Sequence, residues 1–176
     1  MPDRALDGLR VVECGDRVSA TYAGKLMADL GAEVVKVETP GLGHSSRRRG
    51  PFPGGEPHPE KSGLFLYLNC NKRGVTLDLT TPAGRSLLDR LVADADVLIE
   101  DYAPREAEAR GLTYDRLREI NPRLVMASAS PFGQTGPHRD YNAHEITMES
   151  AGGWTWLNGW PDRPDMPPLK PFGSQA

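Results

Sequence analysis

The stretch that decides the fold is LRVVECGDRVSATYAGKLMADLGAEVVKVE, which occupies residues 9–38. Its β-branched ends, residues 9–14 and 32–38, predict two strands. Between them Ser19 is suited to cap a helix, and Gly31 is a natural C-terminal stop. Four apolar side chains fall at helical spacing between these two positions: Tyr22, Leu26, Met27 and Leu30. A strand–helix–strand unit of this kind predicts parallel strands joined by a right-handed crossover.

The same alternation continues along the chain. The pair Thr81-Pro82 has the residue types favoured at the N-cap and first position of a helix, and residues 113–120 predict a second short helix. The run 64–68 is apolar but too short to classify. Three more runs have the composition of strands: residues 74–79, 96–100 and 124–128. Repeated alternation of strands and helices predicts an α/β fold with a mostly parallel sheet.

Composition argues against several classes of protein. The net charge of -3 does not suggest a nucleic-acid-binding protein. No stretch approaches the roughly 18 apolar residues that would span a membrane, and the first residues lack the hydrophobic core of a secretion signal. Cys14 and Cys70 are too far apart to fit a metal-ligand spacing. We therefore expect a cytoplasmic protein with no nucleic-acid or membrane partner.

Gly and Pro gather in two long segments, residues 39–62 and 158–176. Two irregular segments of this length are unusual in so short a self-contained domain. We expect the chain to be a piece of a longer protein. Its first domain would cover residues 1–142, and residues 143–176 would be the incomplete start of an active-site or linker region.

Ligands of open α/β sheets bind beyond the carboxyl ends of the strands. The loops expected at those ends are 15–18, 39–62, 101–112 and 129–142, and none of them is a Gly-rich phosphate loop. The helix N-terminus at Ser19 would present N–H groups to a phosphate. The alternative is that Ser19 only caps the helix.

Two other groups of side chains suit anionic or acyl chemistry. Lys72 and Arg73 are adjacent cations next to the amide of Asn71, which suits a phosphoryl or carboxylate group; an exposed turn would look the same. Glu145 and Glu149 are spaced to share one helix face, which suits proton transfer or attack on an acyl group. The alternative for these two carboxylates is a solvated helix face.

Several segments, taken together, resemble the family III CoA-transferases, also called the CaiB/BaiF family. Their shared order and spacing over residues 6–137 carry the resemblance, since each segment alone is short. In chain order they are LDGLRVVE (6–13), YAGKLMADLGAEVVKVE (22–38), LNCNKRGVTLDL (68–79), DVLIEDYAP (96–104), NPRLV (121–125) and FGQTGP (132–137).

The resemblance implies that the chain is the N-terminal part of a Rossmann-like large domain. It implies an acyl-CoA:carboxylate CoA-transferase, in which an enzyme carboxylate attacks the thioester to form an acyl-enzyme intermediate. Coenzyme A is then a substrate, and no tightly bound cofactor or metal is expected. The family also implies an interlocked homodimer, or pairing with a second CoA-transferase-like half.

The resemblance assigns site residues by position. Glu145 matches an acidic position near the active site, and Ser174 occupies the place of the family's nucleophilic aspartate. Because a serine lacks the carboxylate that forms a mixed anhydride, Ser174 is a departure from the family pattern. The positions that match coenzyme A contacts are Val18, Ser19, Asn71, Lys72, Arg73, Asp101 and Tyr102.

Three hypotheses for function remain open at this point. One is an active CoA-transferase or a related acyl-CoA enzyme, in which Glu145 or an unidentified residue does the chemistry. A second is a catalytically silent half with a structural or pairing role, and a third is a nucleotide-binding module, against which the missing Gly-rich loop counts. Trp154, Trp156 and Trp160 either pack in the ordinary way or form an exposed surface or a substrate wall.

Overall fold

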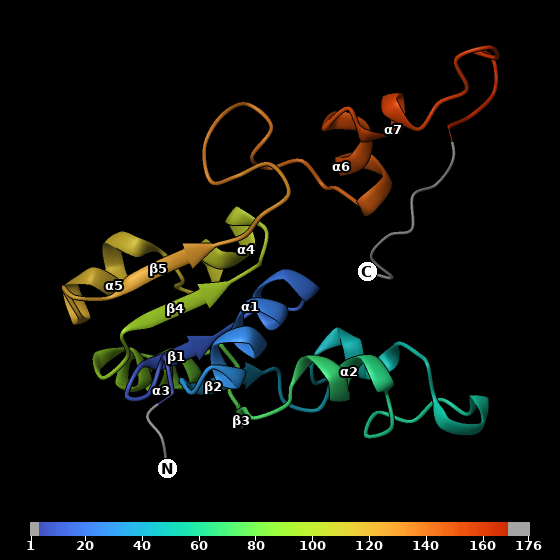
Figure 1. Cartoon of the computed structure of the whole chain (residues 1–176). Coiled ribbons are helices and arrows are strands. Elements are labelled where there is room, and N and C mark those ends of the chain that lie inside the picture. Colours follow the sequence, from blue (N-terminus) through green and yellow to red (C-terminus); the bar gives the residue numbers. More distant parts are fainter. Residues whose placement is uncertain (1–3, 169–176) are drawn as a thin grey trace. The chain divides into compact units, whose positions relative to one another are not determined.

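Five short strands form one parallel sheet in the computed structural model, which describes residues 4–168. All neighbouring strands pair in parallel, in the order β3-β2-β1-β4-β5 (Figure 1). The strands are β1 (Arg10–Glu13), β2 (Glu33–Glu38), β3 (Arg73–Thr76), β4 (Val97–Glu100) and β5 (Val125–Ser128). The α/β class with a parallel sheet is therefore confirmed.

Helices connect the strands as the alternating pattern predicts. Gly31 follows the end of α1 with a φ of 112°, as expected of a C-terminal stop. The Thr81 hydroxyl accepts a hydrogen bond from the N–H of Gly84 at 3.1 Å, so the N-cap predicted for α3 is confirmed. In this unit the helices are α1 (Val18–Asp29), η1 (Ser45–Arg48), η2 (Pro53–Gly55), α2 (Gly63–Leu68), α3 (Pro82–Ala93), α4 (Pro104–Ala109) and α5 (Tyr114–Ile120).

Two details differ from the sequence prediction. The strand expected over residues 74–79 ends at Thr76, after which Leu77 and Leu79 turn into the core. Residues 101–112 were expected to be a loop, yet they contain α4. Its sequence, PREAEA, carries no apolar stripe, and a proline at the first position starts the helix.

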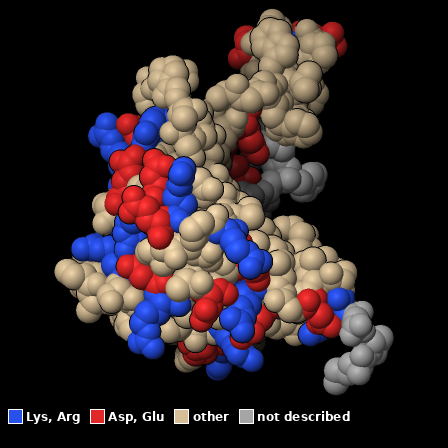
Figure 2. All heavy atoms as spheres, turned by 90° about the vertical axis from the view of Figure 1, so that its left-hand side faces the viewer, with Lys and Arg blue, Asp and Glu red and all other residues tan. Residues whose placement is uncertain are grey.

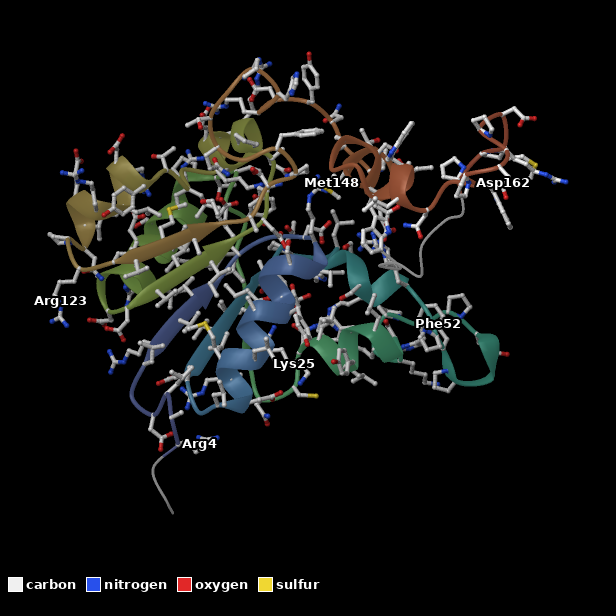
Figure 3. All side chains as sticks on the ribbon, turned by 45° about the horizontal axis from the view of Figure 1, so that its top comes forward. Arg4, Lys25, Phe52, Arg123, Met148 and Asp162 are labelled. Carbon is white, nitrogen blue, oxygen red and sulfur yellow. The ribbon has the colours of Figure 1, made fainter. Side chains whose placement is uncertain are left out.

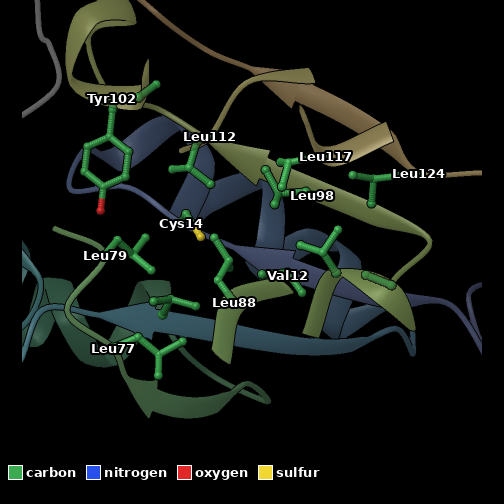
Figure 4. Close-up of a cluster of buried hydrophobic side chains, with 14 residues drawn as sticks. Val12, Cys14, Leu77, Leu79, Leu88, Leu98, Tyr102, Leu112, Leu117 and Leu124 are labelled. Atoms are coloured by element: carbon green, nitrogen blue, oxygen red, sulfur yellow. The ribbon is translucent and has the colours of Figure 1, made fainter. Parts of the chain in front are cut away.

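The sheet has a hydrophobic core on each face because successive side chains of a strand point to opposite sides. On one face Val12 and Leu98 pack with Leu88 of α3 and Leu117 of α5 (Figure 4). On the other face Val11, Val34 and Ile99 pack against the small side chains Ala20 and Ala28 of α1. Small residues bring α1 close to the sheet, and this closeness positions the polar groups at its N-terminal end.

Surface charges of both signs are interspersed over the face shown in Figure 2. Exposed ion pairs of the first unit include Arg73 with Glu33 at 2.5 Å and Arg4 with Asp7 at 3.2 Å. Exposed pairs of this kind contribute little to stability. None of the helices within residues 4–168 combines the length and the apolar composition that a membrane-spanning segment requires.

The chain divides into two compact units, with the boundary between Ser130 and Pro131. The domain boundary expected at residue 142 stays a prediction. The second unit, described to residue 168, contains a turn-rich segment followed by α6 (Glu145–Ala151) and α7 (Trp154–Leu157). Glu145 and Glu149, which were expected to share a helix face, both lie on α6, whereas α7 was not predicted.

We expect Gly84→Ala to destabilise the fold by about 1–3 kcal/mol, because overpacking next to rigid backbone has this cost. An added Cβ would lie 1.9 Å from the carbonyl oxygen of Asp78, which cannot move without shifting the segment before α3. Gly74→Ala is the matched control, since its Cβ would meet no atom within 4 Å. Urea unfolding of both variants checks this. Equal loss of stability in the two would contradict the packing argument.

Candidate functional site

The strand order reverses between β1 and β4, which lie side by side while their connections run to opposite sides of the sheet. In open α/β sheets a ligand binds at such a point, outside the carboxyl ends of the two strands. Here the segment from Cys14 to Arg17 leaves β1, and Asp101 follows β4 directly. The site is therefore built around the N-terminal end of α1.

The Asp101 carboxylate closes the N-terminal end of α1. Its Oδ1 accepts hydrogen bonds from the N–H groups of Asp16 at 2.9 Å and Arg17 at 3.1 Å. Its Oδ2 accepts from the N–H of Ala20 at 2.9 Å and from the Ser19 hydroxyl at 3.2 Å. Burial raises the pKa of Asp101, and these donors act in the opposite direction. The helix terminus thus receives an anion from the protein itself.

This arrangement corrects the expectation for Ser19. The helix begins at Val18, with Arg17 at the N-cap and no capping bond from the Arg17 side chain. Ser19 is therefore not the cap, and three N–H groups near the terminus are already bonded to Asp101. Gly15 permits this approach: its φ is 133°, and a Cβ there would lie 2.0 Å from Asp101 Oδ1. The local capping rule failed because the acceptor for these N–H groups is Asp101, which follows β4 and is distant in sequence.

A buried ion triad lies beside this terminus. Glu13, at the end of β1, has no exposed surface. Its Oε1 lies 2.6 Å from the ammonium of Lys36 on β2, and its Oε2 lies 2.7 Å from that of Lys72. The Lys72 ammonium also donates to the carbonyl of Thr21 at 2.7 Å. Burial lowers the pKa of Lys72 to about 8, and Glu13 opposes that shift.

Gly24 gives Glu13 the room it needs. A Cβ at Gly24 would lie 2.1 Å from Glu13 Oε2 and 3.4 Å from the Lys72 ammonium. The absence of a side chain at this position of α1 therefore lets the helix pass directly over the triad.

A second polar network holds the segment after β2. The Glu38 carboxylate accepts two hydrogen bonds from Arg47, at 2.8 and 2.9 Å, and one from the N–H of His44 at 2.8 Å. The buried His44 ring lies 3.1 Å from the Thr21 hydroxyl. Burial lowers the pKa of His44 to about 3, with Lys36 adding to the shift. His44 is thus a neutral bridge between two loops of the site.

The remaining predicted contacts are spread around this centre. Asn71 has a positive φ of 64°, and its amide donates to Asp29 at 2.8 Å. Arg73 points outward, with its side chain 76% exposed. Tyr102 is buried, its ring lies 4.6 Å below the guanidinium of Arg110, and its N–H donates to Glu100. Lys72 and Asp101 therefore lie at the centre of the site, whereas Asn71 and Arg73 lie at its edge.

Helix α2 places the turn that carries Asn71, Lys72 and Arg73. The Lys25 ammonium of α1, labelled in Figure 3, lies 5.1 Å from the centre of the Tyr67 ring on α2. The side-chain oxygen of Asn69, Oδ1, lies 3.4 Å from the Lys72 ammonium. The turn is thus held against α1. It leads into β3, which lies on the other side of β1 from β4, the strand that Asp101 follows.

The catalytic predictions concern the second unit. Glu145 is the first residue of α6, and its side chain is half-buried. Ser174 lies outside the described residues. Trp156 is 87% exposed, so ordinary packing is wrong for this residue. It lines an apolar hollow of about 640 Å³ together with Trp160 and Met166.

Sequence reasoning missed Glu13, Lys36, Thr21 and His44. The usable signal was a charge inside an apolar strand: Lys36 interrupts Val34-Val35 and Val37, and such a charge must find a partner when buried. Nothing local identified that partner. Within residues 4–168, no group of three or more His, Cys, Asp or Glu side chains is arranged to hold a metal ion.

Residues 6–173 match the family model described as CoA-transferase family III. The chain is 41% identical over 165 residues to a succinyl-CoA–D-citramalate CoA-transferase of Chloroflexus aurantiacus, covering 93% of this chain and 40% of that protein. It is 37% identical to a formyl-CoA:oxalate CoA-transferase of Streptomyces coelicolor, covering 94% of this chain and 39% of that one.

A solved structure agrees with these relatives. A CaiB/BaiF family protein from Brucella suis superposes with a TM-score of 0.84 at 37% identity, covering 97% of this chain and 44% of that chain. The chain thus spans about two fifths of the length of the curated relatives it matches.

We expect Glu13→Gln to destabilise the protein by about 3–5 kcal/mol, because it leaves two buried ammonium groups without a counter-charge. Glu33→Gln is the matched control, since it breaks an exposed pair with Arg73 and has an expected cost of about 0–1 kcal/mol. Chemical denaturation of both variants measures the difference. A mild effect of Glu13→Gln would show that the triad contributes little.

We expect His44 to make stability depend on pH. The folded state keeps the ring neutral down to about pH 3, whereas the unfolded chain takes up a proton near 6.5. This stability is therefore present above about pH 6.5 and is lost as the pH falls. Between pH 7 and pH 5 the native protein should lose about 2 kcal/mol more than His44→Gln. Parallel urea titrations at the two pH values test this, and identical losses would refute it.

Proposed function

The chain belongs to CoA-transferase family III, and we propose that the whole protein transfers coenzyme A between an acyl-CoA thioester and a carboxylic acid. The observation that carries the proposal is the family match over residues 6–173, joined to relatives that are named CoA-transferases. Acyl-CoA is then a substrate, and the protein needs no tightly bound cofactor.

The chemistry would proceed by covalent catalysis. An enzyme carboxylate attacks the thioester carbonyl, the carbon–sulfur bond breaks, and coenzyme A leaves as the thiolate while an acyl-enzyme anhydride forms. The thiolate then attacks the enzyme carboxyl group, which releases the first acid and forms an enzyme thioester. The incoming acid repeats these steps in reverse. Glu145 is the carboxylate that we propose for this role.

The first unit would bind coenzyme A at the carboxyl edge of its sheet. We propose two walls: the start of α1, with Val18 and Ser19, and the turn that carries Asn71, Lys72 and Arg73. The Lys72 ammonium already has three oxygen acceptors within the protein, so this residue would hold the turn in place and contact the ligand through its carbon chain.

Asp101 and Tyr102 would complete the site from β4. The Asp101 carboxylate accepts hydrogen bonds from the N–H groups at the start of α1 and so stabilises the loop. Because both of its oxygens are occupied in this way, it would not repel a phosphate of the ligand directly. Tyr102 would form part of the wall through the backbone, since its ring is buried.

We also propose that the protein pairs with a second copy or with a second CoA-transferase-like half in the cytoplasm. Apolar side chains on both units support pairing. Val125 on the edge strand β5 is 61% exposed, and Trp156 and Leu157 of α7 are exposed as well. Neither Cys14 nor Cys70 forms a disulfide, which suits a reducing compartment.

The whole protein, incubated with succinyl-CoA or formyl-CoA, should form an acyl-enzyme that hydroxylamine traps as a hydroxamate at a carboxylate. We expect Glu145→Gln to abolish trapping and Glu149→Gln, its neighbour one turn along α6, to retain it. Peptide mass spectrometry locates the modified residue.

Other outcomes are equally informative. If trapping survives both substitutions, the nucleophile is a carboxylate other than Glu145 and Glu149, and the proposed CoA-transferase activity is still supported. Coenzyme A binding without any acyl-enzyme would overturn the active transferase and favour the silent half. No binding of coenzyme A at all would end the proposal.

A further inference from the structure

We propose that His44 is a positioning residue for the coenzyme A site, which it shapes by tying the segment after β2 to the start of α1. The inference rests on the proposed function. His44 itself would touch neither substrate nor reacting atoms. It would act through two backbone segments that form the walls of the site.

The hydrogen bonds of the ring define its tautomer. Nδ1 lies 3.1 Å from the N–H of Ser46, which can only donate, so Nδ1 is the acceptor. Nε2 lies 3.2 Å from the carbonyl oxygen of Arg17, which can only accept, so Nε2 carries the hydrogen. The ring is 2% exposed and neutral. Nδ1 therefore faces its own turn, where the Ser46 hydroxyl also lies 2.7 Å away, and Nε2 faces the start of α1, where the Thr21 hydroxyl also lies 3.1 Å away.

The bond to Arg17 reaches the N-cap of α1. Arg17 precedes Val18 and Ser19, the predicted contacts of the first wall, and its N–H is held by Asp101. Ser45 adds a second tie, because its hydroxyl donates to the carbonyl of Asp16 at 2.5 Å. The segment after β2 thus fixes the loop from one side while Asp101 fixes it from the other.

The same segment reaches the second wall. The Ser62 hydroxyl lies 2.6 Å from the carbonyl oxygen of Ser46, and it also caps α2 by accepting from the N–H of Phe65 at 3.1 Å. Helix α2 leads directly into the turn with Lys72. A continuous path of hydrogen bonds therefore runs from the start of α1 through His44, Ser46 and Ser62 to α2. His44 is the member of this path that joins the two loops.

Such a residue should affect substrate binding more than the chemical step. Loosening the two walls lowers the fraction of protein with a formed site, which raises KM for acyl-CoA and the Kd for coenzyme A. The acyl transfer itself would use a carboxylate outside this network, so kcat should change little. Because Ser45 and Asp101 still hold the loop, the expected effect is moderate.

Two substitutions separate the functions of the two nitrogens. In His44→Gln the side-chain amide nitrogen can replace Nε2 and donate to Arg17, whereas in His44→Asn the shorter side chain can replace only Nδ1 within its own turn. We expect His44→Asn to raise KM for acyl-CoA and the Kd for coenzyme A about five- to tenfold, with kcat within about twofold. His44→Gln should stay within about twofold of the native protein in all three.

The measurements are steady-state kinetics and calorimetric titration of the whole protein with coenzyme A, with thermal unfolding recorded for each variant. Equal behaviour of the two variants, or a better result for His44→Asn, would overturn the inference. So would a loss of kcat as large as the rise in KM. Failure of the native protein to bind coenzyme A would instead overturn the proposed function, which keeps the two failures distinct.

Discussion

A carboxylate that has lost all contact with water must be neutralised by cations held in fixed places, and Glu13 imposes this constraint on the first unit. Lys36 on β2 and the turn residue Lys72 approach its two oxygens at 2.6 and 2.7 Å. Meeting that requirement aligns the ends of β1 and β2 and brings the turn under α1. Gly24 must lack a side chain for the same reason. One buried charge thus holds the turn that is proposed as the second wall of the coenzyme A site.

Asp101 solves the complementary problem at the helix terminus. Many α/β proteins leave this terminus open to a phosphate, whereas here a side chain from the end of β4 satisfies its donors. The two carboxylates are stabilised by different groups. Glu13 is paired with two ammonium groups, whereas Asp101 accepts hydrogen bonds from backbone N–H groups. Both lie at the carboxyl edge of adjacent strands. Between them they fix α1 without any ligand, which leaves a preorganised edge for one.

The sequence predicted the parts of the fold whose signals are local. β-Branched runs identified β1, β2 and β4, and the Thr-Pro pair at 81–82 identified the start of α3. Local rules failed where the partner is distant. Lys72 meets Glu13 across 59 residues, and Asp101 replaces the expected cap Ser19 from about 82 residues away. The family resemblance pointed to the loops that carry Lys72 and Asp101, but no pattern in the chain showed that their charged groups are directed inward.

The triad also constrains the order in which the first unit can assemble. Glu13 and Lys36 belong to neighbouring strands and can meet once the first strand–helix–strand unit forms. Lys72 arrives only after the long 39–62 segment has closed, and closing a loop of that length has an entropic cost that nearby contacts must first offset. Docking of the 69–73 turn should therefore come late on the folding pathway. Substitution of Lys72 would then accelerate unfolding and leave the refolding rate nearly unchanged.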